Sequence, residues 1–453
     1  MAPKFGTSGL RGLVTELTPA LVGDHVRAFL KSCPVGIGLY VGRDLRPSSP
    51  DIAGIIIDAA RAAGVHVTDC GAVPTPALAL AAMGAGASAV MVTGSHIPAD
   101  RNGLKFYTPA GEITKAHEQA ILGALGQSGK QGIIGVLARN PLVGGNYIAR
   151  YVDAYGHEAL KGCVVGVYSH STVGRDVLMD VLRGLGAEVI ELGRSEKFIP
   201  VDTEAVDAAT RKQLRAWAAE HRMDAIMSMD GDGDRPLLTD ASGQVIPGDV
   251  LGQITGASLG ADIAVTPVSS NTGAESVFDQ VVRTKIGSPY VIAGMESDMP
   301  ARVVGYEANG GFLLGYAAAG LAPLMTRDSV LPLIAPLVAA SNLGLAALVE
   351  RQPKRFTAAD RLQGISTEKT NAFIAELDTH PSELETFLAP MDSRPAQIDR
   401  TDGLRVTLQD GRIVHLRPSG NAPECRCYAE ADSPEAAQET LSAGLQALMR
   451  ALG

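Results

Sequence analysis

The chain has 453 residues, 46% of them hydrophobic and 19% charged, a composition typical of a soluble globular protein with several domains. Its 39 Lys and Arg against 49 Asp and Glu give a net charge of -10, which excludes a general affinity for nucleic acid or for an anionic membrane. The five cysteines are scattered and the N-terminus lacks the apolar core of a signal peptide, so we expect a cytoplasmic location.

A unit of apolar strand, Gly-rich turn, Ala-rich helix and second strand recurs along the chain. Units of this length predict parallel strands joined by right-handed crossovers, and a common topology of the copies is a hypothesis. The turns of the first two copies both read Val-Gly-Arg-Asp, at 41–44 and 173–176. The first copy has strands at 36–41 and 65–67 and a helix at 51–63; the second has strands at 163–168 and 188–190; the third has strands at 261–265 and 289–292 and a helix at 274–281.

The apolar stretch 330–349 raises the question of a membrane span. Pro332 and Pro336 interrupt it, as does the polar pair Ser341-Asn342, and Asp328-Ser329 in front of it is typical of a helix N-cap. The pattern therefore favours a buried helix, and we expect no membrane partner.

Beyond residue 350 the pattern changes. Residues 351–355 are typical of a linker, strands at 404–408 and 412–416 flank Asp410-Gly411 as a hairpin, and an amphipathic helix begins at about Ser433. The fold class we predict is α/β, with three related α/β domains whose sheets are mixed and mostly parallel, followed by a C-terminal α+β domain. The predicted domains are 1–145, 146–250, 251–352 and 353–453. Ligands of open α/β sheets lie beyond the carboxyl ends of strands, so we expect the chemistry in loops around a central cleft.

The densest cluster of charge is the acidic loop, residues 230–235, which reads Asp-Gly-Asp-Gly-Asp-Arg after an apolar strand at Ala225–Met229. Like charges so close are unfavourable without a cation, and the glycines let the three carboxylates converge on a hard one such as Mg²⁺. An EF-hand is excluded because Arg235 stands where Gly is required and Ala241 where Glu is required. Open metal positions would suit a phosphoryl oxygen, whose charge Arg235 could neutralise.

A second cluster is the serine loop, residues 93–98, which reads Thr-Gly-Ser-His-Ile-Pro after a predicted strand at 87–92. A serine framed by Gly and Pro at a strand end is expected to be exposed and rigidly aimed, and Lys105 follows ten residues later. No Asp or Glu lies within four residues of Ser95, which gives little support to a local Ser-His-Asp triad. Taken alone, the loop could also be an ordinary serine turn.

Three further loops carry polar groups. The N-terminal loop, residues 6–12, contains Arg11, and the glutamate loop, residues 305–311, places Glu307 and Asn309 two positions apart, which suits vicinal sugar hydroxyls or a strained hairpin. The C-terminal loop, residues 417–421, offers a guanidinium, a hydroxyl and an amide to a phosphate, with an ordinary turn as the alternative. The sequence has no phosphate-loop motif and no dinucleotide-binding motif, so nucleotide-dependent transfer and dinucleotide redox chemistry lose support.

Together these five loops, in this order and spanning nearly the whole chain, resemble those of the α-D-phosphohexomutase superfamily of phosphomannomutases, phosphoglucomutases and phosphoglucosamine mutases. The resemblance implies four domains around a central cleft and Mg²⁺ as the cofactor. It also implies small-molecule hexose phosphates as substrates and hexose 1,6-bisphosphate as intermediate and activator. We expect a monomer or a homodimer.

The resemblance also implies residue roles. Ser95 matches the phosphorylated serine, which would hold Mg²⁺ together with Asp230, Asp232 and Asp234. Lys105 and Arg11 match basic groups near the transferring phosphoryl, Lys105 being the candidate proton shuttle, and His96 matches a supporting position beside them. The implied substrate-binding residues are Arg235, Gly305, Glu307, Asn309, Arg417, Ser419, Gly420 and Asn421.

The chain departs from the family pattern at three places. Family loops commonly read G-E-x-S-G-H, whereas this chain has Asn309 for the serine and Gly311 for the histidine. Ser288 stands where some members carry a histidine, and Asn421-Ala422-Pro423 stands where Thr-Glu-Pro is frequent.

The implied reaction interconverts a hexose 6-phosphate and its 1-phosphate. Among substrates, phosphomannomutase activity ranks first, phosphoglucomutase or dual activity second, and phosphoglucosamine mutase activity third. A phosphoryl hydrolase and an inactive sensor that binds sugar phosphates are the alternatives outside the mutases.

Overall fold

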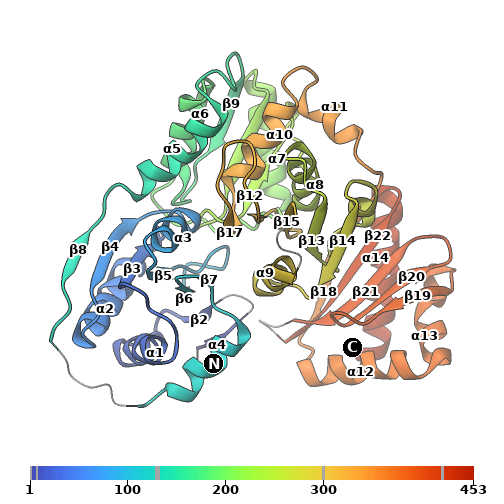
Figure 1. Ribbon diagram of the computed structural model, residues 1–453. Coiled ribbons are helices and arrows are strands. Elements are labelled where there is room, and N and C mark those ends of the chain that lie inside the picture. Colours follow the sequence, from blue (N-terminus) through green and yellow to red (C-terminus); the bar gives the residue numbers. More distant parts are fainter. Residues whose placement is uncertain (1–2, 7–8, 128–132, 298–300, 420–422) are drawn as a thin grey trace.

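The computed structural model describes residues 3–6, 9–127, 133–297, 301–419 and 423–453 (Figure 1). Within these residues the strands form four sheets, which follow one another along the chain. Figure 1 shows the units built on these sheets in an arc, from blue through green and gold to red. The predicted α/β class, with an antiparallel unit at the C-terminal end, is confirmed; the limits of the four domains stay predictions.

The first sheet contains the serine loop. Its strands are β1 (Lys4–Phe5), β2 (Leu10–Leu13), β3 (Leu39–Arg43), β4 (Val67–Ala72), β5 (Ser88–Val92), β6 (Arg101–Thr108), β7 (Gly111–Glu112) and β8 (Leu137–Arg139). The helices are α1 (Pro19–Ser32), α2 (Ser49–Ala62), α3 (Thr75–Gly84) and α4 (Lys115–Ala124). The strand order is β1-β2-β6-β5-β3-β4-β8, with β7 beside β6.

The second and third sheets are smaller. The second unit has α5 (Val143–Tyr155), β9 (Val164–Tyr168), α6 (Arg175–Gly184), β10 (Glu188–Leu192), α7 (Ala208–Glu220), β11 (Ala225–Met229) and β12 (Pro236–Leu238). The third has α8 (Gly248–Ser258), β13 (Ile263–Pro267), η1 (Thr272–Ser276), β14 (Gln280–Thr284), α9 (Ser288–Ser297), β15 (Val303–Tyr306), β16 (Phe312–Leu314), β17 (Leu324–Asp328), α10 (Val330–Ala339) and α11 (Leu345–Glu350).

One strand order recurs in these three sheets. The order β4-β3-β5-β6 of the first sheet is repeated as β10-β9-β11-β12 and as β14-β13-β15-β16. In each case the first three strands are parallel and the fourth is antiparallel. The hypothesis of a shared topology is confirmed. The serine, acidic and glutamate loops follow β5, β11 and β15, so all three loops occupy the same place in the repeat.

Two elements predicted for the third copy are wrong. The helix expected at 274–281 is the short 3₁₀ turn η1, and β14 begins at Gln280. The strand expected at 289–292 lies in helix α9. The β-branched run Val281-Val282 suits a strand, whereas Pro289 occupies the first turn of α9, where a missing backbone N–H costs no hydrogen bond.

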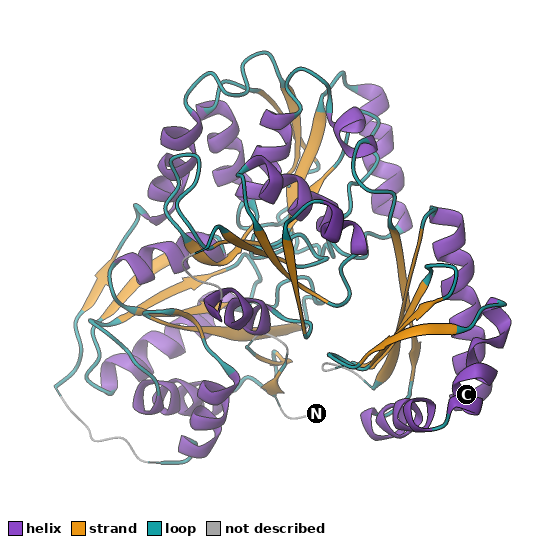
Figure 2. Ribbon diagram, turned by 45° about the vertical axis from the view of Figure 1, so that its right-hand side comes forward, coloured by secondary structure: helices purple, strands orange, loops and turns teal. Residues whose placement is uncertain are grey.

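The fourth unit is α+β. Its elements are β18 (Phe356–Gln363), α12 (Thr367–Thr379), α13 (Pro381–Leu388), η2 (Ala389–Met391), β19 (Pro395–Asp399), β20 (Leu404–Leu408), β21 (Ile413–Pro418), β22 (Glu424–Ala431) and α14 (Pro434–Leu452). Every neighbouring pair in the order β18-β22-β21-β20-β19 is antiparallel, and Figure 2 shows the helices on one side of this sheet. The predicted hairpin is confirmed as β20–β21. The predicted C-terminal helix is confirmed as α14, whose N-cap Ser433 accepts a hydrogen bond from the N–H of Ala436.

The apolar stretch at 330–349 is divided between α10 and α11. Helix α10 is buried along most of its length, as predicted, and no helix among the described residues has the length and apolarity to cross a membrane. The N-cap predicted at Asp328-Ser329 is confirmed: Ser329 is the N-cap residue of α10, and Asp328 Oδ1 accepts from the N–H of Val330 at 3.0 Å. The Oγ of Ser329 donates to the carbonyl of Gly233 in the acidic loop at 2.7 Å.

The buried cores explain how the loops are held. One hydrophobic core runs through the first three units and includes Leu78, Leu182, Met229 and Leu331. The fourth unit has a core of its own, in which Leu448 of α14 packs against the sheet. The loops of the first three units therefore project from a continuous packed base, to which the fourth unit is attached separately.

Candidate active site

The acidic loop joins β11 to β12. Asp230, Asp232 and Asp234 are fully buried, and one oxygen from each lies within 4.8 Å of the other two. Asp230 Oδ1 accepts hydrogen bonds from the N–H groups of Asp234 at 3.1 Å and Arg235 at 3.2 Å, which curl the loop. Gly231 allows the serine loop to approach, because a Cβ there would lie 2.6 Å from the carbonyl oxygen of Ser95.

The charge in this loop fits a divalent cation. Burial and repulsion from Asp232 and Asp234 raise the pKa of Asp230 well above its usual range. Among the described residues, Asp232 Oδ1 and Asp234 Oδ1 are buried without a hydrogen-bond partner. In that part of the chain no other group of three His, Cys, Asp or Glu side chains has a comparable arrangement. Hard carboxylate oxygens are the donors that Mg²⁺ prefers, so these residues fit the metal expected from the sequence.

Ser95 contacts the acidic loop directly. Its Oγ donates a hydrogen bond to Asp230 Oδ2 at 2.5 Å, across 135 positions of sequence. The expectation that Ser95 is exposed is wrong: only 2% of the residue is accessible, because the acidic loop covers it. Its φ of 53° lies in the left-handed region, which few residues other than glycine adopt, and Thr93 Oγ1 holds the turn by accepting from the Ser95 N–H at 2.8 Å.

Arg46, which the sequence did not single out, binds the backbone carbonyls of the serine loop. Its Nη2 donates to the carbonyls of Ser95 at 2.9 Å and Ile97 at 2.6 Å, and its Nη1 donates to those of Pro98 at 2.7 Å and Arg101 at 2.9 Å. The guanidinium is fully buried and paired with Asp44 at 3.2 Å. A planar group with five donors suits such a cluster of carbonyls. Arg46 therefore fixes the backbone that carries Ser95.

Arg46→Ala is expected to lower the free energy of unfolding by about 3–5 kcal/mol, because it leaves the buried Asp44 carboxylate without its cation. Chemical denaturation measures this change. Arg183→Ala is the matched control, since that arginine pairs with Asp180 on an exposed surface and its loss should cost about 0.5 kcal/mol or less. Equal effects of the two substitutions would contradict the role given to Arg46.

Lys105 and Arg11 bring positive charge to the same place. Lys105, on β6, donates from Nζ to Asp232 Oδ2 and Asp234 Oδ2, both at 2.5 Å. Burial opposes ionisation of Asp232, but Lys105 and the hydroxyl of Thr75 hold its pKa below the usual range. Arg11, on β2, donates to the carbonyl of Thr93, and burial lowers the pKa of Arg11 to about 10, which still leaves it charged at neutral pH. The structure thus brings both predicted basic residues to the acidic and serine loops.

His96 and Arg235 lie side by side at the edge of this cluster. His96 Nδ1 is 3.4 Å from Ser95 Oγ and 3.0 Å from Arg235 Nη1. Burial and the guanidinium of Arg235 lower the pKa of His96 well below its usual value, so the imidazole is neutral at neutral pH. A neutral ring can accept a hydrogen bond from Arg235, which supports a positioning role for His96.

The glutamate loop is a closed turn. The N–H of Glu307 donates to the carbonyl of Gly311 at 3.2 Å, and the side-chain oxygen of Asn309 accepts from the N–H of Gly311 at 3.0 Å. The Glu307 and Asn309 residues are buried. Gly305 lies inside β15, where its missing side chain makes room for Met295 of α9, and its substrate-binding role stays a prediction. Ser288, at the place of a family histidine, donates to Glu112 Oε2 of the first unit at 2.7 Å.

The C-terminal loop lies on the fourth unit. Arg417 is at the end of β21 and its Nε is 3.6 Å from Asp402 Oδ2, while the N–H of Ser419 donates to the carbonyl of Glu424 at 3.0 Å. These contacts join the loop to its own sheet and not to the acidic loop. Gly420 and Asn421 lie outside the described residues.

Two further side chains that the sequence did not single out contact the carboxylates of the acidic loop. Thr75, the first residue of α3, donates from Oγ1 to Asp232 Oδ2 at 2.5 Å. Arg327, on β17, has Nη2 at 2.8 Å from Asp234 Oδ2. Arg327 lies near the carboxyl end of its strand, a position from which a role in the site could have been predicted. Nothing in the sequence around Thr75 indicated such a role.

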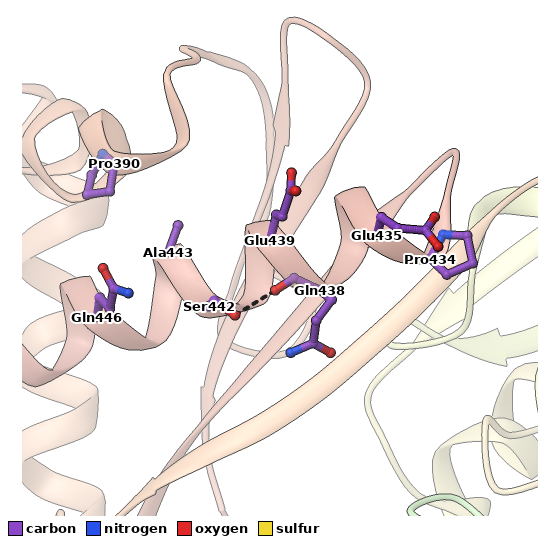
Figure 3. A pocket seen from close by; sticks show the side chains of 8 residues that line it. All are labelled: Pro390, Pro434, Glu435, Gln438, Glu439, Ser442, Ala443 and Gln446. Carbon is purple, nitrogen blue, oxygen red and sulfur yellow. Dashed lines mark hydrogen bonds between the residues drawn. The ribbon is translucent and has the colours of Figure 1, made fainter.

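An open hollow lies elsewhere, along the outer face of α14 (Figure 3). Its lining includes Pro390 and the carboxylates of Glu435 and Glu439, and Ser442 in it donates to the carbonyl of Gln438 of its own helix. The acidic side chains would repel an anionic ligand. The hollow is therefore a poorer candidate for binding a phosphorylated ligand than the site around Ser95.

The assembled groups suit transfer of an anionic group to and from a serine oxygen. Ser95 Oγ touches a carboxylate that can share a cation with its neighbours, and Lys105, Arg11 and Arg235 surround the same point. Fixed cations and a hard metal site stabilise the charge that develops on a phosphoryl group in transfer.

The chain matches the models of three domains of one family. These are "Phosphoglucomutase/phosphomannomutase, alpha/beta/alpha domain I" at residues 2–132, "alpha/beta/alpha domain III" at 248–356 and "C-terminal domain" at 368–443. A phosphomannomutase of Sinorhizobium fredii is 45% identical, covering 99% of this chain and 99% of its own. A phosphomannomutase of Salmonella muenchen is 41% identical, covering 99% of this chain and 96% of its own.

Solved structures share the fold. The crystal structure of a phosphoglucomutase/phosphomannomutase family protein from Burkholderia thailandensis matches with a TM-score of 0.78 and 22% identity. The match covers 98% of this chain and 97% of that one. At this identity the likeness concerns the fold alone.

Proposed function

Because the chain belongs to the phosphoglucomutase/phosphomannomutase family, we propose that it is a phosphosugar mutase of the phosphomannomutase type that works through a phosphoserine at Ser95. The observation that carries the proposal is the contact between Ser95 Oγ and Asp230 Oδ2, at 2.5 Å, beside three clustered carboxylates. This contact joins the loops that follow equivalent strands of two units.

In the proposed reaction the phosphorylated Ser95 meets a hexose 6-phosphate. The sugar's free hydroxyl oxygen forms a bond to phosphorus, the bond from phosphorus to Ser95 Oγ breaks, and the proton of the hydroxyl is relayed to the departing Ser95 Oγ. The product is a hexose 1,6-bisphosphate, which turns end for end. Its other phosphoryl group then returns to Ser95 and leaves the hexose 1-phosphate. Positioning and charge neutralisation carry such transfers.

The side chains around Ser95 would have different roles in this phosphoryl transfer. Arg11 and Arg235 would neutralise the phosphoryl oxygens, and Lys105 would pass the proton between the sugar hydroxyl and Ser95 Oγ. Mg²⁺ held by Asp230, Asp232 and Asp234 would supply Lewis-acid polarisation of the phosphoryl oxygens. Arg46 and Thr93 keep the serine oxygen aimed at this point.

Sugar recognition would fall to the remaining loops. Glu307 and Asn309 would accept and donate hydrogen bonds to the ring hydroxyls, while Arg417 and Ser419, with Gly420 and Asn421 beside them, would hold the phosphate that is not being transferred. The fourth unit has its own core and joins the rest through residues 351–355, which supports a clamp that adapts to either end of the sugar.

The molecule's five cysteines are free thiols, which supports the proposed cytoplasmic location. The proposed monomer or homodimer is distinguished by light scattering after size-exclusion chromatography.

The purified protein is expected to convert mannose 6-phosphate to the 1-phosphate in the presence of Mg²⁺ and a trace of hexose 1,6-bisphosphate. Comparing kcat/KM for the mannose, glucose and glucosamine phosphates measures the preference, which should favour mannose. Release of free phosphate without the 1-phosphate would instead indicate a hydrolase. Binding without turnover of any hexose phosphate would indicate a sensor.

A further inference from the structure

Arg327 is a buried cation for which the reaction described above has no role. It lies on β17, three positions before the first residue of α10, with only 3% of its side chain accessible. Its Nη2 is 2.8 Å from Asp234 Oδ2, and its Nη1 is 3.6 Å from Glu307 Oε2. Asp234 belongs to the acidic loop and Glu307 to the glutamate loop, so one guanidinium joins the proposed cation site to the proposed sugar site.

The glutamate loop is shaped to receive this arginine. A Cβ at Gly311 would lie 2.8 Å from Cδ and 2.9 Å from Cγ of Arg327, closer than real contacts allow. The absence of a side chain at Gly311 therefore makes the space that the arginine stem fills. The side chain that fills this space comes from the neighbouring strand β17.

The planar guanidinium also explains why this position suits an arginine better than a lysine. Arginine can address two carboxylates through two separate nitrogens, whereas a lysine ammonium is a single point charge. A buried carboxylate such as Glu307 needs a partner to hold a fixed orientation. Arg327 supplies that partner from the side of the acidic loop.

We propose that Arg327 is a positioning residue that fixes Glu307 for hexose recognition and, through its charge beside Asp234, weakens divalent-cation binding at the acidic loop. The inference rests on the proposed function, because it assigns Glu307 to the sugar and Asp234 to the cation. Arg327 acts through these two carboxylates: its loss removes a positive charge beside both and the contact that orients Glu307.

The two sites should respond in opposite directions when this cation is removed. Without Arg327, Glu307 loses its orientation, so hexose phosphate binds less well. The acidic loop at the same time loses a positive charge beside Asp234, so a divalent cation binds more tightly. A merely structural arginine would weaken both sites together with the thermal stability.

The test uses two variants. Arg327→Gln removes the positive charge, and Arg327→Lys keeps the charge but lacks the second nitrogen that contacts a carboxylate. In Arg327→Gln, KM for the hexose phosphate should rise roughly ten- to a hundredfold, the range for losing the hydrogen bond between the Glu307 carboxylate and a sugar hydroxyl. Mn²⁺ binding to the sugar-free protein, followed by electron paramagnetic resonance, should tighten about threefold or more. Arg327→Lys should weaken sugar binding while leaving Mn²⁺ binding close to that of the parent.

Arg302→Gln is the matched control, because Arg302 pairs with Asp262 on an exposed surface of the same unit. It should leave KM and Mn²⁺ binding unchanged. Gly311→Ala is an independent variant that keeps the charge but pushes the arginine stem aside, and it should raise KM for the hexose phosphate as well.

Two results would overturn the inference: an unchanged KM in Arg327→Gln, or Mn²⁺ binding that weakens in that variant. Both are read against a parent protein that turns over hexose phosphate. If the parent protein does not turn over hexose phosphate, the proposed function is wrong. Mn²⁺ binding to the parent and to Arg327→Gln would still show whether Arg327 affects the acidic loop.

Discussion

The Ser95→Ala variant is expected to lose mutase turnover by roughly a thousandfold or more, because the oxygen that carries the phosphoryl group is gone. Initial rates with mannose 6-phosphate, Mg²⁺ and a trace of bisphosphate measure the loss. The fold should survive, since alanine at a φ of 53° is strained no more than serine and Arg46 still binds the backbone of the loop.

Ser88→Ala is the matched control for this variant. Ser88 is also fully buried, on the strand that leads into the serine loop, and its Oγ donates to the carbonyl of Gly38 at 3.0 Å. It should cost some stability and leave turnover near that of the parent. Full activity in Ser95→Ala would contradict the phosphoserine mechanism, and equal losses in the two variants would indicate damage to the sheet.

Asp230→Asn is expected to weaken divalent-cation affinity by about tenfold or more and to reduce turnover with it, because one of three hard ligands loses its charge. The cation-free protein should be at least as stable as the parent. Burial and repulsion from Asp232 and Asp234 disfavour the charged form of Asp230 and raise its pKa, so a neutral amide relieves the repulsion. Calorimetric titration with Mg²⁺ and thermal melting without it measure the two effects.

The control for Asp230→Asn is Asp224→Asn, on the residue just before β11. Asp224 Oδ2 accepts from the N–H of Val164 at the other end of the strand, away from the acidic loop. This substitution should leave Mg²⁺ affinity unchanged. Unaltered Mg²⁺ affinity in Asp230→Asn would mean that the acidic loop is structural.

The sequence predicted the places of the chemical groups because those places follow from local patterns. Short apolar runs marked β5 and β11, and polar residues directly after them marked the serine and acidic loops. A sheet brings the carboxyl ends of its parallel strands to one edge, so each loop could be placed at an edge of its own sheet. The contact between the serine and acidic loops joins two different sheets and could not be inferred in this way. That the two loops belong to equivalent strands of a repeat became visible only in the sheet order.

The third copy of the repeat was predicted poorly because its segments are ambiguous. The stretch 274–281 contains alanine and valine and suits either a helix or a strand, and the parallel pairing of β14 with β13 decided for a strand from Gln280. Short apolar runs such as 289–292 cannot be assigned from periodicity alone.

Polar contacts between residues far apart in the chain could not be predicted from the sequence. Thr75 meets Asp232 across 157 positions, and Arg46 meets the carbonyl of Ser95 across 49 positions. Neither residue stands in a motif, and each matters through a partner that only folding brings near. The exposure of Ser95 was misjudged for the same reason, since the covering acidic loop comes from another unit.

The most direct test of the phosphoserine mechanism is to follow a labelled phosphoryl group. The protein is incubated with hexose 1,6-bisphosphate labelled in both phosphates, digested, and mapped by mass spectrometry, and a second sample is chased with unlabelled mannose 6-phosphate. The account predicts label on Ser95 before the chase and its transfer to the sugar afterwards. Turnover without label on Ser95, or with label on another residue, would contradict it.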